Sequence, residues 1–328
     1  MRLAVAAAAT LVAAAFVILR NRFLRGWPGD ADLAVVGARA FRAGRNPFTT
    51  VGPHRAIPWP FPFYYPFTTV LLAAPFTTLP PIDFRLLVVA GGTGLLAWAL
   101  TKERSLNVVV PALASGAMFG AWQAGQWTPL LTAAALLPGL GWLFAAKPNF
   151  GLAVGTYRAH FAPYLLALAF VIAATLAWPG WIAAWRATLA ESPHFAEPAL
   201  LFPFGPAMLL ALLRWRRPEA RLLVTCALVP QSTLVYETLP LVCLVPATPR
   251  EARVLSAGSL LALGVQLFIA QHATPFPVLT RDTGLAELPL VYLPCLVMVL
   301  SRPNQGELPT WLAWIERRWV ARRPMARD

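Results

Sequence analysis

The sequence predicts an all-α protein that crosses a membrane several times. Hydrophobic residues make up 58% of the 328 residues and charged residues only 12%, whereas a soluble domain carries roughly 25% charged residues. Apolar stretches of about 15 to 20 residues, long enough to span the hydrocarbon core of a bilayer, recur along the chain. We therefore expect about ten transmembrane or membrane-embedded helices in residues 1–303, followed by a basic tail in residues 304–328.

The expected spans follow one another with short polar connections. The first covers residues 3–19, and no small-residue cleavage site follows it, so we expect an uncleaved span rather than a signal peptide. The others cover residues 67–79, 84–100, 108–122, 127–146, 161–178, 199–213, 222–246, 254–270 and 288–300. The segment 67–79 is short enough to be re-entrant. The run 222–246 contains Pro230 and is either one span or a broken pair of half-helices. Residues 311–323 have the pattern of a basic amphipathic helix on the membrane surface.

The net charge of +13 is explained by membrane topology rather than by a nucleic-acid partner, because the arginines cluster between apolar runs. The positive-inside rule places residues 102–104, Lys147, 214–221, 250–253 and the C-terminal tail on the cytoplasmic side. The loop 20–66 conflicts with this rule, because it is rich in arginine and yet faces outward if residue 1 is inside. Either segment 67–79 does not cross the membrane, or the arginines of the loop are functional.

Several classes of site are not predicted. The three cysteines all lie inside apolar runs, and no Cys/His spacing supports a disulfide framework or a structural zinc site. There is no glycine-rich phosphate loop, no HExxH sequence and no nucleic-acid motif. We therefore expect no metal and no other cofactor.

The loop 20–66 holds the most concentrated polar chemistry in the first hundred residues. Asp30 and Asp32 are the first two acids of the chain. The apolar residues after them recur at three- and four-residue spacing, which predicts an interfacial helix that ends near Gly44 and Asn46-Pro47. The further candidate residues of this loop, for contact with a phosphate or another part of a substrate, are Arg39, Arg42, Arg45, His54, Tyr64 and Tyr65.

Several short motifs occur in an order found in one family of membrane enzymes. They are Asp30, Gly44-Arg45-Asn46-Pro47-Phe48, Tyr64-Tyr65-Pro66, Pro75, Gly125-Gln126 and Lys147-Pro148. In this order and spacing the chain resembles the family 87 glycosyltransferases, also called the DUF2029 or polyprenol-phosphate-mannose-dependent mannosyltransferase family, which have the membrane GT-C fold. The resemblance covers roughly residues 25 to 150.

The resemblance implies a polyprenyl-phosphate sugar donor, a glycolipid or glycan acceptor, inversion at the anomeric carbon and no obligatory metal. It also implies transfer at the outer face of a bacterial cytoplasmic membrane, with an aspartate of the first outer loop as general base. A glycine follows that aspartate about fourteen residues later, and Asp30 with Gly44 fits this spacing whereas Asp32 does not. The chain departs from the family at Ala34, where an aromatic residue is usual, and at Phe48, where the motif usually has tyrosine.

Each candidate in the loop also has a simpler interpretation. Asp30 precedes a helical pattern and suits a helix N-cap, which is compatible with a catalytic role. Asp30-Ala31-Asp32 also matches the D-x-D motif by which soluble glycosyltransferases hold a metal and a nucleotide sugar. The loop arginines are alternatively ordinary interfacial cations in contact with membrane lipids.

Four further candidates also have two interpretations each. His54 and His194 lie in loops on the same predicted side as Asp30, and either contact a substrate or are simply solvated. Gln126 lies between two spans, where it either binds sugar hydroxyls or ends a helix. Glu237 is an acid within an apolar run, so it is either functional or hydrogen-bonded to the break at Pro230.

From these patterns we expect a membrane glycosyltransferase that moves a hexose, with Asp30 as base. The alternative is a polytopic transporter or a flippase for lipid-linked sugars, which would show repeated helices and ionisable residues in the middle of the bilayer. A catalytically degenerate relative with a scaffolding role is a third possibility. The ionisable residues are concentrated in loops, which favours the enzyme.

Overall fold

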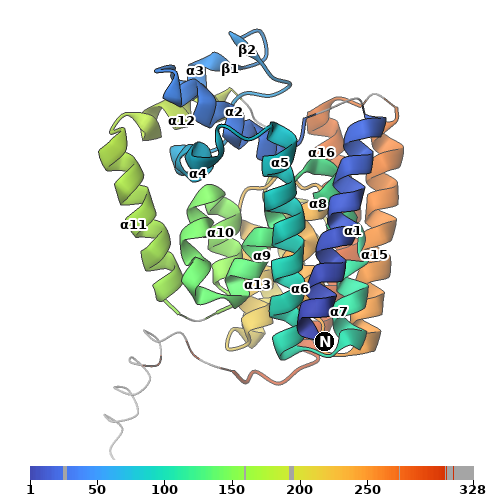
Figure 1. The fold of residues 1–328 in the computed structure, drawn as a ribbon. Helices are drawn as coiled ribbons and strands as arrows, with labels where there is room; N and C mark the ends of the chain where they lie inside the picture. Colours follow the sequence, from blue (N-terminus) through green and yellow to red (C-terminus); the bar gives the residue numbers. More distant parts are fainter. Residues whose placement is uncertain are drawn as a thin grey trace, which may run out of the picture.

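A computed structural model describes residues 1–24, 28–158, 160–191, 196–272, 274–306, 308 and 313. In this part of the chain the protein is a bundle of helices, which confirms the all-α prediction (Figure 1). The described strands are β1 (Val51–Gly52) and β2 (Ile57–Pro58), which pair in parallel with Val51 opposite Ile57. The expected amphipathic helix at residues 311–323 lies almost wholly outside the described residues.

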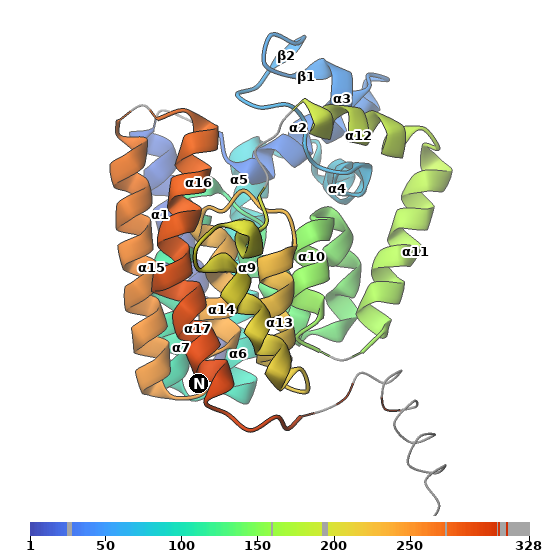
Figure 2. The same cartoon turned by 180° about the vertical axis from the view of Figure 1, so that it is seen from behind.

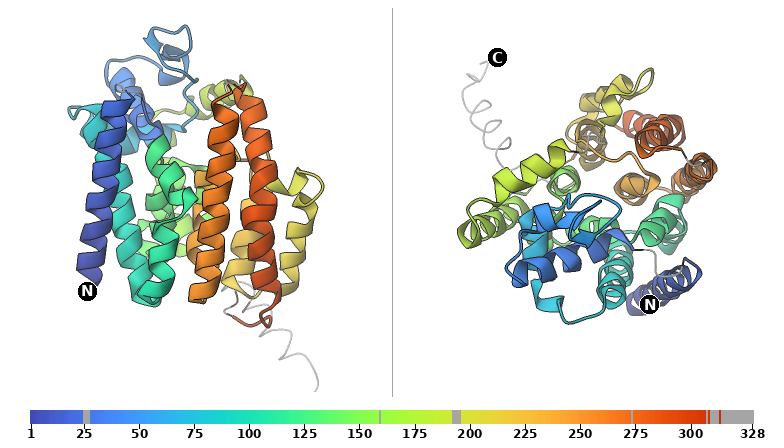
Figure 3. Two further views of the ribbon diagram at one scale, coloured as in Figure 1. Left: turned by 90° about the vertical axis from the view of Figure 1, so that its right-hand side faces the viewer. Right: turned by 90° about the horizontal axis from the view of Figure 1, so that it is seen from above.

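Four described helices are long and apolar enough to cross a membrane. They are α1 (Arg2–Phe23), the continuous helix Pro81–Glu103, α15 (Pro249–Ala270) and the continuous helix Phe276–Leu300. The pair α11 (Ala162–Ala177) and α12 (Trp181–Ala190) is a fifth candidate, bent by 102°. Figures 2 and 3 show α15 and the helix after it side by side over most of the bundle's height. The protein is therefore a membrane protein by length and composition of its helices. The described residues provide four candidate spans, or five with the bent pair, so the expected number of about ten is not confirmed.

The remaining apolar runs are divided into shorter helices, mostly at prolines, which cannot donate a backbone hydrogen bond and so interrupt a helix. Pro138 and Pro148, for example, begin new helical segments after α9. Two of the long helices contain a π-helical stretch, between α5 (Pro81–Leu86) and α6 (Gly92–Glu103) and between α16 (Phe276–Glu287) and α17 (Leu293–Leu300). The shorter segments are α2 (Asp30–Arg42), α3 (Pro47–Thr50), α4 (Phe67–Ala73), η1 (Ala74–Phe76), α7 (Leu106–Leu113), α8 (Gly116–Ala124), α9 (Thr128–Leu136), η3 (Pro138–Ala146), α10 (Pro148–Gly155), η4 (Pro198–Leu200), η5 (Gly205–Arg214), α13 (Pro218–Leu228), η6 (Val235–Thr238) and α14 (Leu239–Leu244).

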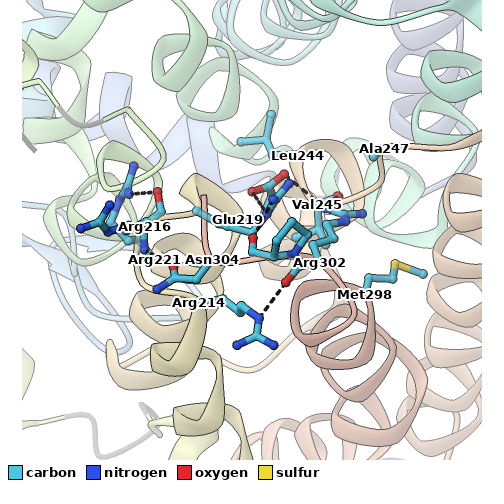
Figure 4. Close-up of polar contacts among 12 residues, drawn as sticks. Arg214, Arg216, Glu219, Arg221, Leu244, Val245, Ala247, Met298, Arg302 and Asn304 are labelled. Carbon is cyan, nitrogen blue, oxygen red and sulfur yellow. Dashed lines mark hydrogen bonds and ion pairs between the residues drawn. The ribbon is translucent and has the colours of Figure 1, made fainter. Parts of the chain in front are cut away.

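The bundle has two distinct ends. The N-terminus marks one of them, called here the N-terminal end, and α2, α3, β1, β2 and α12 lie at the other, called here the loop end (Figure 1). At the N-terminal end, Arg302 bonds to Glu219 at 3.1 Å and to Glu251 at 2.6 Å, and Arg214 donates to the Arg302 carbonyl (Figure 4). The basic connections 214–221 and 250–253 therefore lie on one side, as the positive-inside rule predicts.

The segment 67–79 does not cross the bundle. The segment begins beside the loop, and its end, after η1, also contacts the loop. Arg39 of α2 donates to the Thr77 carbonyl oxygen at 2.9 Å and to the Leu79 carbonyl oxygen at 2.6 Å. Both ends of the segment thus lie at the loop end, as the first of the two alternatives for the charged loop predicts. Helix α5 then starts at the loop end and α6 finishes at the N-terminal end, so the arginine-rich loop stays on the side opposite residues 102–104 (Figure 1).

The prediction that Lys147 lies on the same side of the bundle as residues 102–104 is wrong. Gln126, before α9, and Lys147, after η3, line the same cavity at the loop end. The segment 127–146 therefore enters the bundle and returns instead of crossing it. Thr69 Oγ1 of α4 donates to the Ala146 carbonyl at 2.7 Å, which holds the end of η3 beside α4.

The run 222–246 is a broken pair, as one of the two interpretations predicts. It starts at the N-terminal end, where Arg221 donates to the Thr156 carbonyl at 3.1 Å. It reaches the loop-end cavity at Ser232 and returns to Pro246, whose carbonyl accepts a hydrogen bond from Arg104. The break at Pro230 thus places a non-helical segment against the cavity.

Candidate active site

A cavity of about 420 Å³ lies beneath the loop 28–66. Its ionisable lining residues other than tyrosine are Arg20, Asp30 and Lys147. The polar and aromatic residues that complete the lining are Trp59, Phe61, Tyr64, Tyr65, Gln126, Asn149, Trp185, Ser232, Tyr236 and Phe276. Of the candidates from the sequence, Asp30, Tyr64, Tyr65 and Gln126 are therefore brought together here.

Asp30 is the first residue of α2, and it is not the cap of that helix. Gly29 occupies the cap position, and its backbone N–H donates to Oδ2 of Asp32 at 2.9 Å. The capping carboxylate is therefore Asp32, in the third helical position, and Asp30 is left to face the cavity. Asp30 is half-buried, and its Oδ2 accepts a hydrogen bond from Nε2 of Gln126.

Two glycines fix the position of Asp30 relative to the cavity. Gly125 ends α8 with φ = 67°, a left-handed conformation that favours glycine. Its carbonyl accepts from the backbone N–H of Ala31 at 2.9 Å, and a Cβ atom on Gly125 would lie 3.0 Å from Cα of Gly29. Because neither glycine has a side chain, the start of α2 packs directly on the turn that carries Gln126.

Asp32 makes a buried ion pair instead of facing the cavity. Nε of Arg85 donates to Oδ1 at 3.0 Å, and a second guanidinium nitrogen contacts Oδ2. The exposed fractions of the Arg85 and Asp32 side chains are 2% and 3%. Both carboxylate oxygens are thus occupied, which argues against Asp32 as a base and against a metal-binding role for Asp30-Ala31-Asp32.

Lys147 and Glu237 form a second ion pair, at the wall of the cavity. Nζ of Lys147 lies 2.8 Å from Oε1 of Glu237. The other Glu237 oxygen accepts from the backbone N–H of Thr233 at 3.1 Å, within the break that follows Pro230. The hydrogen bond to the break after Pro230 is thus confirmed, and Glu237 in addition pairs with a cation that lines the cavity.

The surroundings of Asp30 make it a stronger base than an aspartate in water. Burial raises the pKa of the Asp30 carboxyl to about 6, and the charges of Glu237 and Asp32 add to this increase. The charge of Lys147 and the hydrogen bond from Gln126 act in the opposite direction. Burial also raises the pKa of the Tyr65 phenol well above its ordinary value, so Tyr65 keeps its proton and can donate it in a hydrogen bond.

The expected arginine and histidine ligands lie away from the cavity. Arg39 and Arg42 are bound to the end of η1, through the Thr77 and Leu79 carbonyls and the Thr77 hydroxyl. Arg45 and His54 are exposed and are not among the residues that line the cavity. His194 lies outside the described residues. The cations at the cavity are instead Arg20 and Lys147, which sequence reasoning did not select for this site.

Aromatic residues from the loop and from α12 form the rim of the cavity. Nε1 of Trp185 donates to the Tyr64 carbonyl at 2.6 Å, and Arg55 pairs with Glu191 at 2.5 Å. The rings of Phe61 and Phe276 have centroids 5.3 Å apart. These contacts connect the loop to α12 and α16, so the loop covers the cavity as part of the bundle.

One polar atom of Gln126 has no hydrogen-bond partner among the described residues. Its Nε2 donates to Asp30, whereas Oε1 is buried without a hydrogen-bond partner among the described residues. A buried acceptor without a partner is costly. Gln126 therefore contributes to the cavity mainly through its N–H, which donates to Asp30.

Comparison of the chain with protein families, curated proteins and solved structures finds no match. The assignment of a function therefore depends on the cavity and on the sequence motifs that line it.

Proposed function

We propose that this protein is a membrane glycosyltransferase that moves a hexose from a polyprenyl-phosphate donor to a hydroxyl group of a glycolipid or glycan. The observation that carries the proposal is the cavity at the loop end, where Asp30 faces the same space as Lys147 and Arg20. A base and two cations are what transfer from a sugar phosphate requires. The resemblance of Asp30, Gly125-Gln126 and Lys147-Pro148 to family 87 glycosyltransferases supports the same conclusion.

The chemistry needs one proton acceptor and stabilisation of one departing anion. The acceptor oxygen attacks the anomeric carbon while the bond from that carbon to the phosphate oxygen breaks, which inverts the configuration. Asp30 takes the hydroxyl proton as the new bond forms. Lys147 and Arg20 face the negative charge that develops on the departing polyprenyl phosphate.

The size and lining of the cavity fit this substrate class. A volume of about 420 Å³ is within the range of small-molecule sites, roughly 300 to 1,000 Å³. Trp59 and Trp185 offer flat apolar faces beside polar groups, which suits a hexose ring. The polyprenyl chain would remain in the bilayer, beside a cavity at the end of an apolar bundle. We propose a bacterial cytoplasmic membrane with the loop end outward.

One observation favours a second candidate, a transporter for a lipid-linked sugar. Helices that break within the membrane next to a charged residue are typical of transporters, and the break at Pro230 lies beside Glu237. That arrangement accounts for Glu237 and Lys147 but gives no role to the basic carboxylate of Asp30. We therefore place the transporter second.

The proposal is tested with purified protein in lipid nanodiscs and synthetic polyprenyl-phosphate hexoses, with short-chain glycolipids as acceptors. Transfer from the lipid-linked donor, and none from the nucleotide sugar of the same hexose, is expected. Transfer from the nucleotide sugar alone would contradict the proposal. If no sugar is transferred but fluorescent lipid-linked sugar moves between the leaflets of proteoliposomes, the protein is a transporter.

The rate of transfer is expected to fall in acid as Asp30 becomes protonated. Because the pKa of Asp30 is raised to about 6, the base is active above this pH and is lost as the pH drops through it. The logarithm of kcat/KM should therefore decrease with unit slope below about pH 6. A rate that is constant down to pH 4.5 would show that Asp30 does not act as the base.

Removing the hydrogen bond from Gln126 is expected to shift this acid limb to higher pH. The N–H of Gln126 stabilises the ionised form of Asp30 and lowers its pKa, so Gln126→Leu should raise the pKa. The matched control is Asn149→Leu, because Asn149 also lines the cavity but donates to the Pro230 carbonyl. The pH profile of kcat/KM should move in Gln126→Leu and stay in place in the control.

A further inference from the structure

We propose that Glu237 is a positioning residue that holds Lys147 away from Asp30 and thereby keeps Asp30 available as a base. The proposal rests on the function proposed above, and it explains why a buried acid lies behind the cavity. The alternative arrangement, in which the ammonium group pairs with Asp30, would turn the base into one half of a salt bridge.

The backbone of Lys147 is fixed at the junction of η3 and α10. The preceding carbonyl, that of Ala146, accepts from Thr69 at 2.7 Å, and the Lys147 carbonyl accepts from the backbone N–H of Gly151 at 2.7 Å. The side chain of Lys147 is therefore the only part of this residue that can move between Glu237 and Asp30. Its Nζ lies 5.2 Å from the ring centre of Tyr236 and 2.8 Å from Oε1 of Glu237.

Glu237 is fixed by the segment that follows Pro230, and its side chain is too buried to contact a ligand. Its side chain is 1% exposed, whereas that of Lys147 is 13% exposed and lines the cavity. Oε2 accepts from the backbone N–H of Thr233, and the Thr233 hydroxyl donates to the Thr280 carbonyl of α16 at 2.6 Å. This chain of contacts connects α16 to the ammonium group, and it holds a carboxylate that is not itself among the residues lining the cavity.

Asp30 and Glu237 are thus two acids that interact with one ammonium group. Lys147 is bound to Glu237, so the side chain that donates to Asp30 is the neutral amide of Gln126. Lys147 and Asp30 nevertheless line the same cavity. The titratable and charged groups around Asp30 are Arg20 of α1, Asp32 of α2 with its partner Arg85 of α5, Tyr65 of the loop, Lys147 before α10, and Tyr236 and Glu237 of η6.

Neutralising Glu237 has two effects on Asp30, and both have the same sign. It removes a negative charge that disfavours ionisation of Asp30, and it releases the ammonium group to pair with Asp30. An opposite charge within about 4 to 6 Å lowers the pKa of a carboxyl group by about 1 to 3 units. The base would then be weaker, and its acid limb would lie at lower pH.

The test compares Glu237→Gln with the double variant Glu237→Gln/Lys147→Met. The glutamine keeps an oxygen for the Thr233 N–H and removes only the charge, so the break after Pro230 retains its support. We expect Glu237→Gln to move the acid limb of kcat/KM down by about one pH unit or more and to reduce the plateau about 10-fold or more. Glu103→Gln, which neutralises an exposed acid paired with Arg158 far from the cavity, should change neither quantity.

The double variant separates positioning by Glu237 from a general structural role. Without the ammonium group, Asp30 has no new partner, so its titration should return to that of the wild type or to higher pH. The titration is followed by infrared difference spectra of the Asp30 carboxyl group, identified as the signal absent from Asp30→Asn, and it needs no substrate. Equal Asp30 titration in wild type and Glu237→Gln, or an unreversed shift in the double variant, would overturn the proposal. Absence of sugar transfer in every variant would instead count against the function, and the infrared titration would still decide on Glu237.

Discussion

Replacing Asp30 by asparagine is expected to reduce sugar transfer by about 10²- to 10⁴-fold, the usual contribution of a general base. The substitution keeps the shape of the side chain and removes its ability to accept a proton. Gln126 would still find an oxygen for its N–H, so the start of α2 should keep its position. The effect should therefore appear in kcat and not in the unfolding temperature.

The measurement is single-turnover transfer from a polyprenyl-phosphate hexose, with binding of the donor followed separately. Asp30→Asn should bind the donor with similar or higher affinity, because a negative charge near the phosphate is removed. Glu191→Gln is a suitable control, since this acid also lies at the loop end but pairs with Arg55 at the surface. A rate for Asp30→Asn within about threefold of the wild type, far less than a missing base should cost, would exclude Asp30 as the base.

The position of Asp30 could be predicted because its signals are local. A helix begins at Asp30 and ends at Arg42, Gly44 follows in the left-handed conformation, and Asn46 caps α3. Each of these features depends on residues within one or two turns of helix. The structure places Asp30 at the cavity and Asp32 in a buried ion pair, and the capping role expected of Asp30 belongs to Asp32.

The location of Lys147 could not be predicted, because hydrophobicity does not distinguish a segment that crosses from one that returns. Residues 127–146 are apolar in either case, since both arrangements surround them with apolar neighbours. The decisive features are Pro138, which turns the chain, and the carbonyl contacts from Thr68 and Thr69. These depend on α4, which lies about 70 residues earlier in the sequence and itself does not cross the bundle.

The arginines of the loop illustrate the opposite problem, in which one pattern allows several partners. The spacing of Arg39 and Arg42 is equally suitable for a phosphate, for lipid headgroups and for backbone carbonyls at the end of a helix. The structure shows the third case, at Thr77 and Leu79. The position of Arg85 was itself informative, because an arginine inside an expected span needs a buried anion as partner.

Replacing Arg85 by methionine is expected to destabilise the protein by about 3 to 5 kcal/mol, the usual cost of removing one partner from a buried ion pair. Arg85 and Asp32 are almost completely buried, so water cannot replace the lost guanidinium group. The Asp32 carboxylate would keep the N–H of Gly29 and lose its compensating charge. The start of α2, and with it Asp30, would then be the least stable part of the loop end.

The double variant Arg85→Met/Asp32→Asn should recover most of this loss. Asparagine retains an oxygen for the Gly29 N–H and brings no charge into the bundle, and replacing a whole buried ion pair by neutral groups is often close to neutral. Thermal unfolding of the protein in one detergent gives the comparison, and a double-mutant cycle gives the coupling between the two residues. Additive losses in the double variant would show that the pair does not act as a unit. A recovered stability, together with restored transfer, would show that the ion pair supports the active site only by holding α2 against Gly125.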